Sequence, residues 1–391
     1  MTQSSQDGPK PVCLVRDPIR TFDSWKHVGW VDVNDFVNCC IDIIQFLGRS
    51  ELRDTPCLLY ERLVVQPRVE VKRICDLWGI PFSDDMLCFE KPLQTHLQGG
   101  EMGTTQSLLT TAESYTSIVN NIPWHGQLSN SEIDHIERQV GSHYMRCWGD
   151  RIGELRAALA KKTWICFDLD DTLHEFRKAS AAAIESTMQV LQRAYGVPVQ
   201  DLKDRYAEVL AQKTASAFVE GKTSHDYRRE RFAAVMAHFS LPTDDDPVLD
   251  GLLDTYEAVL TRSLELKPGA VDLLAFIRAR GKKVAVITEG PQDAQERTVE
   301  RLGLAAQVDF LATTSRFEVS KTGGLFGRVL RHLDVDATDV AYVGDSQARD
   351  MAPAAATGIF AIHLSERDNV DLDARPPRIN SLHKLKFIMS P

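Results

Sequence analysis

The chain has 391 residues, of which 43% are hydrophobic and 26% charged, a composition that supports a buried core and excludes an intrinsically disordered protein. At roughly 150 residues per domain, this length predicts two or three domains. The 55 acidic residues exceed the 45 basic ones, and the resulting formal net charge of -10 argues against broad binding to nucleic acids or acidic membranes.

Several features bear on the compartment of the protein. No apolar run approaches the roughly 20 residues that a bilayer-spanning helix needs. The N-terminal residues lack the charged-then-apolar pattern of a secretion signal. The 8 cysteines include no CxxC pair, so reduced thiols are favoured over a disulfide or metal framework. We therefore expect a soluble cytoplasmic protein that binds neither membranes nor nucleic acids.

A charged helical segment, Glu154 to Lys162, separates two regions with α/β patterns. We detect no low-complexity tract and no internal repeat in either region. We place the domain boundary in this segment, and expect one domain at 1–155 and a second at 156–391.

Apolar runs in the second region predict the strands of one sheet. They lie at 163–167, 284–287, 308–312, 340–343 and 359–362. Helical patterns separate them, which is typical of a parallel α/β sheet. Between the first two strands the pattern is almost entirely helical from about residue 176 to 262, so we expect this block to form an inserted cap.

Acidic residues follow the first of these strands. Asp168, Asp170 and Asp171 stand at its carboxyl end, where burying charge is costly unless a cation or a reaction uses it. Ligands of open α/β sheets also bind at this edge. Four further polar residues follow the later strands, namely Thr288, Lys321, Asp345 and Asp350.

Together these residues match the pattern DxDx[TV]…[ST]…K…GDxxxxD and resemble the haloacid dehalogenase superfamily from about residue 161 to the C-terminus. The resemblance implies a Rossmann-like parallel sheet with a helical cap and a Mg²⁺-dependent hydrolase. One departure is Thr322 after Lys321, where the family usually has proline. Dehalogenases of the superfamily lack an acid at the position of Asp170, so its presence favours hydrolysis of phosphate esters.

The resemblance also implies catalytic roles for individual side chains. Asp168 would attack phosphorus and form an aspartyl-phosphate, and Asp170 would protonate the leaving oxygen and later deprotonate water. Thr288, Glu289 and Lys321 would bind the substrate, with the lysine stabilising the negative charge that accumulates in the transition state.

A metal site is implied at the same strand ends. Mg²⁺ prefers oxygen ligands, and Asp168, Asp345 and the backbone carbonyl of Asp170 would supply them. Asp350 would be a further ligand or would orient Lys321.

The expected cap contains a densely charged segment, residues 221–231. Lys222, Arg228 or Arg229 could contact the substrate, but we favour a solvated helix face as the interpretation of this run. The residues around Thr288 look most like the nucleotidase and sugar-phosphatase branch of the superfamily.

The first region carries a separate signature. Arg16 follows a predicted strand at 12–15, and Ser24 lies eight residues further on, in a helix that begins between them. An arginine fork and a hydroxyl near a helix N-terminus suit a phosphate dianion. This arrangement resembles the 3'-phosphate-binding motif of sulfotransferases. Other parts of the region agree with it, namely 60–63, 75–82, His96, Gly99, Gly100, Trp124 and 145–149.

Sulfotransferases also have an upstream loop that cradles the 5'-phosphosulfate, and no GxxxxGK[ST]-like loop precedes Val12. We therefore expect a partial sulfotransferase-like α/β domain without activity of its own, serving as a structural or interaction module through which the chain could form homo-oligomers. Three functions remain open: a phosphatase of a small phosphorylated metabolite, a sulfotransferase/phosphatase system completed by a companion chain or a longer N-terminus, and a non-catalytic scaffold for phosphorylated ligands.

Overall fold

The computed structural model describes residues 11–29, 32–49, 55–87, 124–213, 218, 220–243 and 247–391. The chain forms two units, Met1–Ile152 with Arg367–Asp371, and Gly153–Glu366 with Leu372–Pro391. His96, Gly99 and Gly100 of the predicted sulfotransferase-like region lie outside the described residues, as does Cys88. Among the described helices, none is long and apolar enough to cross a membrane.

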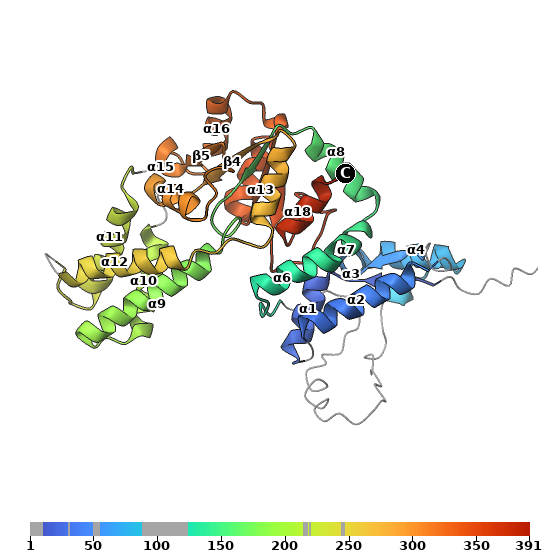
Figure 1. The fold of residues 1–391 in the computed structure, drawn as a ribbon, viewed down its shortest axis with the longest axis horizontal. Helices are drawn as coiled ribbons and strands as arrows, with labels where there is room; N and C mark the ends of the chain where they lie inside the picture. The colour runs from blue at the N-terminus through green and yellow to red at the C-terminus, as the bar shows by residue number, and fades with distance from the viewer. Residues whose placement is uncertain are drawn as a thin grey trace, which may run out of the picture. The chain divides into compact units, whose positions relative to one another are not determined.

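Within the described residues, six parallel strands form the sheet of the second unit, in the order β5-β4-β3-β6-β7-β8 (Figure 1). They are β3 Trp164–Phe167, β4 Lys283–Thr288, β5 Phe310–Thr313, β6 Val340–Gly344, β7 Phe360–Leu364 and β8 Arg378–Ile379. Phe167 of the central β3 is in register with Val286 of β4 and Val343 of β6. The predicted parallel sheet is confirmed, whereas the two-residue β8 follows no apolar run and is not anticipated by the sequence.

Helices cover both faces of this sheet. They are α13 Ala270–Ala279, α14 Gln292–Arg301, α15 Thr314–Phe317, α16 Leu325–Leu333, α17 Ala352–Ala356 and α18 Leu382–Met389. Trp164 and Cys166 of β3 belong to one core cluster with residues of α16 and α17. Ile165 and Phe167 alternate with them, so they point to the opposite face, and they too are fully buried.

Between β3 and β4, four helices of the described residues form a cap, which stands beside the sheet in Figure 1. They are α9 Phe176–Tyr195, α10 Val199–Lys213, α11 Ser224–His238 and α12 Pro247–Arg262. Apolar residues of all four helices form a separate core cluster, to which α11 contributes Phe232, Val235 and Met236. The cap therefore has a hydrophobic core of its own.

The two linkers between the cap and the sheet are tied to each other. The amide of Glu175 donates to the carbonyl of Glu265 at 2.9 Å, and the amide of Lys267 donates to the carbonyl of Leu173 at 3.0 Å. The buried Lys267 ammonium also pairs with Glu175 at 3.1 Å and with Glu366 at 2.7 Å. These bonds hold the ends of the cap together at the carboxyl end of β3.

The first unit is built around a two-stranded parallel sheet, β1 Cys13–Val15 and β2 Cys57–Leu59. Its helical elements are α1 Pro18–His27, α2 Val33–Leu47, α3 Tyr60–Val65, α4 Pro67–Trp78, the 3-10 helix η1 Asp84–Leu87, α6 Asn130–Ile136, the π-helix η2 Glu137–Gly141 and α7 Ser142–Arg146. Asp17 caps α1 by accepting from the amide of Ile19 at 2.8 Å. Helix α8, Asp150–Ala160, contains the boundary between the two units. The seven described cysteines form no disulfide with one another.

Candidate active site

Asp168 directly follows β3, and its amide donates to the carbonyl of Val343 on β6 at 2.9 Å. This register places the carboxylate at the sheet edge where β4 and β6 also end. Its Oδ1 lies 2.8 Å from Nζ of Lys321, and both side chains are buried. The nucleophile predicted from the sequence therefore has a cation in direct contact.

The Lys321 ammonium is shared between two buried carboxylates. Its Nζ also lies 2.5 Å from Oδ1 of Asp350, which accepts a further hydrogen bond from the Tyr342 hydroxyl at 2.8 Å. Oδ2 of Asp350 accepts from the amide of Ser346 at 2.9 Å. Both oxygens of Asp350 are thus bonded, one of them to Lys321, and its roles as a metal ligand or as the group that orients the lysine stay predictions.

Burial and charge act on these groups in opposite directions. Burial raises the pKa of the Asp168 carboxyl, and the Lys321 ammonium opposes that shift. Burial lowers the pKa of Lys321, but Asp168 and Asp350 more than offset this and leave that pKa raised. Lys321 therefore carries its positive charge throughout the neutral pH range.

An acidic group that could hold a metal ion forms at the same edge. It consists of Asp168, Asp345 and Asp350, with one oxygen from each lying within 4.8 Å of the others. A set of hard oxygen donors fits Mg²⁺. Asp345 also pairs with the Arg177 guanidinium at 2.8 Å, so that the first turn of the cap helix α9 contacts the group.

The Asp170 side chain faces a different environment from that of Asp168. Its Oδ1 hydrogen-bonds Nε2 of the buried His174 at 2.9 Å, and its Oδ2 accepts from Nε2 of Gln295 at 3.3 Å. Asp170 is absent from the acidic group, which fits a metal contact through its backbone carbonyl only. Its carboxylate is 23% exposed and lines the pocket described below, where it can exchange protons.

Thr288 ends β4 and is 1% exposed, yet its hydroxyl has no hydrogen-bond partner among the described residues. Such a buried orphan group is rare and calls for a ligand or water. The carboxylate of the next residue, Glu289, accepts from the backbone amide of Lys321 at 3.1 Å. In the structure Glu289 therefore holds the lysine loop, and its predicted contact with substrate stays a prediction.

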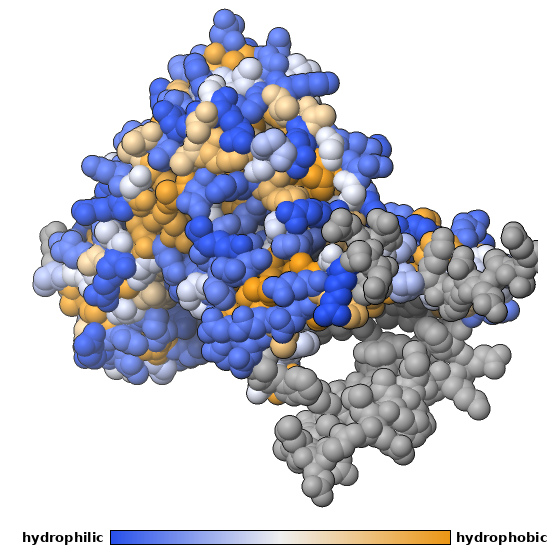
Figure 2. Space-filling model, turned by 45° about the vertical axis from the view of Figure 1, so that its right-hand side comes forward, coloured by the Kyte–Doolittle hydropathy of each residue, from blue (hydrophilic) through white to orange (hydrophobic). Residues whose placement is uncertain are grey.

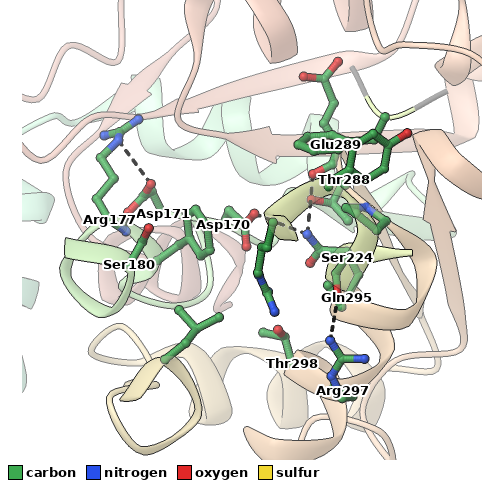
Figure 3. A pocket seen from close by; sticks show the side chains of 18 of the residues that line it. Asp170, Asp171, Arg177, Ser180, Ser224, Thr288, Glu289, Gln295, Arg297 and Thr298 are labelled. Atoms are coloured by element: carbon green, nitrogen blue, oxygen red, sulfur yellow. Dashed lines mark hydrogen bonds and ion pairs between the residues drawn. The ribbon is translucent and has the colours of Figure 1, made fainter. Parts of the chain in front are cut away.

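A pocket of about 270 Å³ joins these groups to the cap. Asp168, Asp170, Thr288, Lys321 and the acidic group line its sheet side, and residues of α9, α10, α11 and α12 line the other side. Figure 3 shows Asp170, Thr288 and Gln295 close together, with Arg177 and Asp171 on one side and Arg297 with Ser224 on the other. All the residues predicted for the second domain's site thus border one cavity.

Four further residues contact the predicted site residues and carry no sequence signature of such a role: His174 and Gln295 bond Asp170, Arg177 bonds Asp345, and Tyr342 bonds Asp350. His174 lies four residues after Asp170, a spacing that becomes informative only once the turn between them is known. That turn has Asp171 in a left-handed conformation with φ 59°. Gln295 lies 125 residues from Asp170 in the sequence, and Tyr342 lies in a strand eight residues before Asp350. No local sequence pattern therefore identifies either contact.

In the first unit, the two residues of the predicted phosphate site differ in availability. The Nε and Nη2 atoms of Arg16 are buried without a hydrogen-bond partner among the described residues, and its guanidinium lies 5.0 Å from the ring centroid of Tyr60. The Ser24 hydroxyl donates to the carbonyl of Arg20 in its own helix at 3.2 Å. Arg16 thus has free donors, whereas Ser24 would have to break an existing bond.

A capped parallel sheet with acidic and basic side chains at its central strand ends defines a hydrolase site. The chain belongs to the haloacid dehalogenase-like hydrolase family, whose model matches residues 163–358. The comparison bears out the resemblance for the second domain; it does not extend to the first region, for which sulfotransferase likeness stays a prediction.

Two relatives carry functional names. The chain is 25% identical over 230 residues to a glyceraldehyde 3-phosphate phosphatase of Methanocaldococcus jannaschii, covering 58% of this chain and 96% of the relative. It is 26% identical over 216 residues to a ribulose-1,5-bisphosphate 5-phosphatase of Halopiger xanaduensis, and the match covers 54% of this chain and 87% of the relative. Among solved structures, a 2-haloacid dehalogenase from Pseudomonas syringae matches with 26% identity and a TM-score of 0.45. The match covers 58% of this chain and 98% of the dehalogenase chain.

The shared ammonium gives a first prediction. Replacing Lys321 by Met leaves two buried carboxylates without their cation, which should lower the free energy of unfolding by about 3–5 kcal/mol. Tyr342→Phe removes one neutral donor from Asp350 and should cost only about 1–2 kcal/mol. Urea unfolding of the full chain in EDTA, followed by circular dichroism, measures both. Equal stability of Lys321→Met and wild type would contradict the assigned ion pairs.

Proposed function

We propose that the protein is a Mg²⁺-dependent phosphatase that hydrolyses a small phosphorylated metabolite through an aspartyl-phosphate. The observation that carries the proposal is the arrangement of Asp168 and Asp170 in one pocket. One carboxylate lies against a buried ammonium, while the other is held by His174 and Gln295 and remains accessible. These environments suit a nucleophile and a proton carrier, respectively.

In the first step, an oxygen of Asp168 attacks phosphorus and the bond from phosphorus to the ester oxygen breaks. The electron pair of that bond goes to the leaving oxygen, which takes the proton of Asp170. The Thr288 hydroxyl and the Lys321 ammonium bind phosphoryl oxygens and stabilise their charge in the transition state. Both groups border the pocket at the end of β4 and beside Asp168.

In the second step, water attacks the phosphorus of the aspartyl-phosphate and Asp170 takes the proton that the water loses. Inorganic phosphate leaves and the Asp168 carboxylate is restored. Mg²⁺, held by Asp168, Asp345 and the carbonyl of Asp170, would neutralise part of the phosphoryl charge. His174 and Gln295 keep the Asp170 carboxylate turned toward the pocket in both steps.

The two named relatives support this class of substrate, because both are phosphatases of small phosphorylated compounds by name. The alternative of a non-catalytic scaffold is less well supported. A protein that only binds a phosphorylated ligand has no need for Asp170 or for the two side chains that hold it.

A panel of phosphorylated metabolites tests the proposal. We expect release of inorganic phosphate from at least one member in the presence of Mg²⁺, and loss of this activity after EDTA treatment with recovery on adding Mg²⁺. Absence of phosphate release from the whole panel under both conditions would argue for the scaffold.

The nucleophile gives a second prediction. Asp168→Asn should lower turnover to below about a hundredth of the wild-type rate, because an amide cannot form the phosphoenzyme. The variant should remain folded by circular dichroism, since its shape is kept. Turnover well above this limit in a folded variant would assign the nucleophile to another residue.

Asp170 gives a third prediction, which separates leaving groups. In Asp170→Asn, esters with poor alkoxide leaving groups should form the phosphoenzyme about 10²–10⁴ times more slowly, because the leaving oxygen lacks its proton donor. An aryl ester such as p-nitrophenyl phosphate needs no such proton, so a burst of nitrophenol should precede slow turnover. Stopped-flow measurement of the first turnover compares the two. Equal slowing of both esters without a burst would show that Asp170 is not the general acid.

For the first unit we propose a sulfotransferase-like module that retains at most an anion site at Arg16. The free Nε and Nη2 donors of this arginine support the proposal. A bifunctional sulfotransferase/phosphatase is the second candidate, and it would need a phosphosulfate loop in addition to this anion site.

We also propose a cytoplasmic protein that forms homo-oligomers through the first unit. Most of the exposed large hydrophobic side chains of the described residues belong to this unit, including Leu14, Ile43, Phe46, Val65 and Val69. On the face shown in Figure 2, groups of hydrophobic residues interrupt an otherwise hydrophilic surface. Burying such side chains between two copies would be favourable.

The anion site gives a fourth prediction. Adenosine 3',5'-bisphosphate should bind the full chain weakly, and Arg16→Ala should abolish the heat of binding because the fork of donors is lost. Titration calorimetry at matched protein concentration measures both. A control is Arg73→Ala, whose guanidinium donates to the carbonyl of Cys57 at 2.7 Å and is exposed. Identical heats for wild type and Arg16→Ala would leave the unit a structural module.

A further inference from the structure

One face of the cap helix α11 lines the active-site pocket. Ser224, Tyr227, Arg228 and Arg231 all border the cavity, and their spacing of three, four and seven residues places them on one side of the helix. The sequence favours a solvated face for this charged run. That fits Arg229, which is partly exposed and paired with Asp250, but not Arg228, whose side chain is 12% exposed, or Arg231, which is only 9% exposed.

Arg231 differs from its neighbours in having no carboxylate partner among the described residues. Arg228 pairs with Glu257, and Arg297 pairs with Asp293 at 2.8 Å. The Nε and Nη2 atoms of Arg231 are buried and have no hydrogen-bond partner in the described part of the chain. Its guanidinium instead hydrogen-bonds the Tyr206 hydroxyl and lies 5.4 Å from the ring centroid of Phe218.

The two unpartnered atoms belong to one edge of the guanidinium. The Nε–H and an Nη2–H point the same way and form the fork that binds a carboxylate or phosphate in a bidentate manner. A buried charge without a counter-ion is costly, so the arrangement is unfavourable unless an anion completes it. The pocket that Arg231 lines is the place from which such an anion can come.

Contacts to the sheet domain fix the helix that carries Arg231. The Ser224 amide and hydroxyl at the start of α11 donate to Asp293 of α14 at 3.0 and 2.6 Å, and Arg297 of α14 donates to the Ser224 hydroxyl at 2.8 Å. Arg231, two turns along α11, is therefore held in a defined position relative to Thr288 and Asp168, which line the same cavity.

We propose that Arg231 forms a second oxyanion subsite, so that preferred substrates carry a carboxylate or a second phosphate in addition to the phosphate that is hydrolysed. The proposal rests on the phosphatase function and names its substrate class. The sheet side of the pocket binds the reacting phosphate, and the cap side selects the remainder of the molecule by its charge.

Matched esters test the subsite in the full chain with Mg²⁺. One series consists of phosphorylated ω-hydroxy acids of increasing length, a second of phosphorylated diols of the same lengths, and a third of α,ω-bisphosphates. At the length that spans the pocket, kcat/KM should favour an anionic ester over the diol ester about 10- to 100-fold. The acid and bisphosphate series show which oxyanion is preferred.

The ratio of kcat/KM values should fall to about 1 in Arg231→Gln and keep an intermediate value in Arg231→Lys, which retains the charge but not the fork. Arg229→Gln removes the same charge from the same helix outside the pocket and should leave the ratio unchanged. A wild-type ratio near 1 at every length, or the same ratio in Arg231→Gln, overturns the subsite and leaves the phosphatase function intact.

A binding measurement keeps the subsite testable if no ester is hydrolysed, which would refute the phosphatase function itself. α,ω-Dicarboxylates should raise the melting temperature of the wild type and of Arg229→Gln above that in sodium chloride of equal ionic strength, but not that of Arg231→Gln. An equal rise in Arg231→Gln, or no rise in the wild type, overturns the subsite.

Discussion

The site depends on one ammonium placed between two buried carboxylates. Lys321 contacts Asp168 and Asp350 at 2.8 and 2.5 Å, and none of the three side chains has appreciable exposure. Three charges of this kind are stable together and costly apart. The end of β3, which carries Asp168, and the segment after β6, which carries Asp350, must therefore lie close together. The parallel register of β3 with β4 and β6 brings their carboxyl ends to the same edge.

The same register explains why the sheet, and the meeting of the motif residues at one edge of it, could be predicted from sequence. Each motif residue follows an apolar run, and parallel strands bring their carboxyl ends to one edge. Asp168, Thr288 and Asp345 can thus be placed together without knowing any side-chain contact. Residues whose contacts depend on the path of a turn cannot be predicted in this way. Gln295 reaches Asp170 only because α14 passes beside the turn after β3.

Arg231 shows a different limit of sequence reasoning. A run with many charges indicates a solvated helix, and this holds for Arg229. Yet the positions of Ser224, Tyr227 and Arg231 form a single helical face, and the burial of that face is decided by α10, α12 and the sheet domain. Periodicity could have identified the face, but only packing shows that its last arginine has no counter-ion among the residues that the structure describes.

The two sides of the pocket differ in how their charged and polar groups are paired. On the sheet side, Lys321 and the carboxylates satisfy one another, so this part of the site is stable without ligand. The Thr288 hydroxyl and one edge of Arg231 are left without partners in the same cavity. Each such buried group is costly while it lacks a partner, and a bound ligand can supply the missing hydrogen bonds. A ligand with two oxyanions, one for each group, satisfies both at once, whereas a monoanion leaves the cap arginine unpaired.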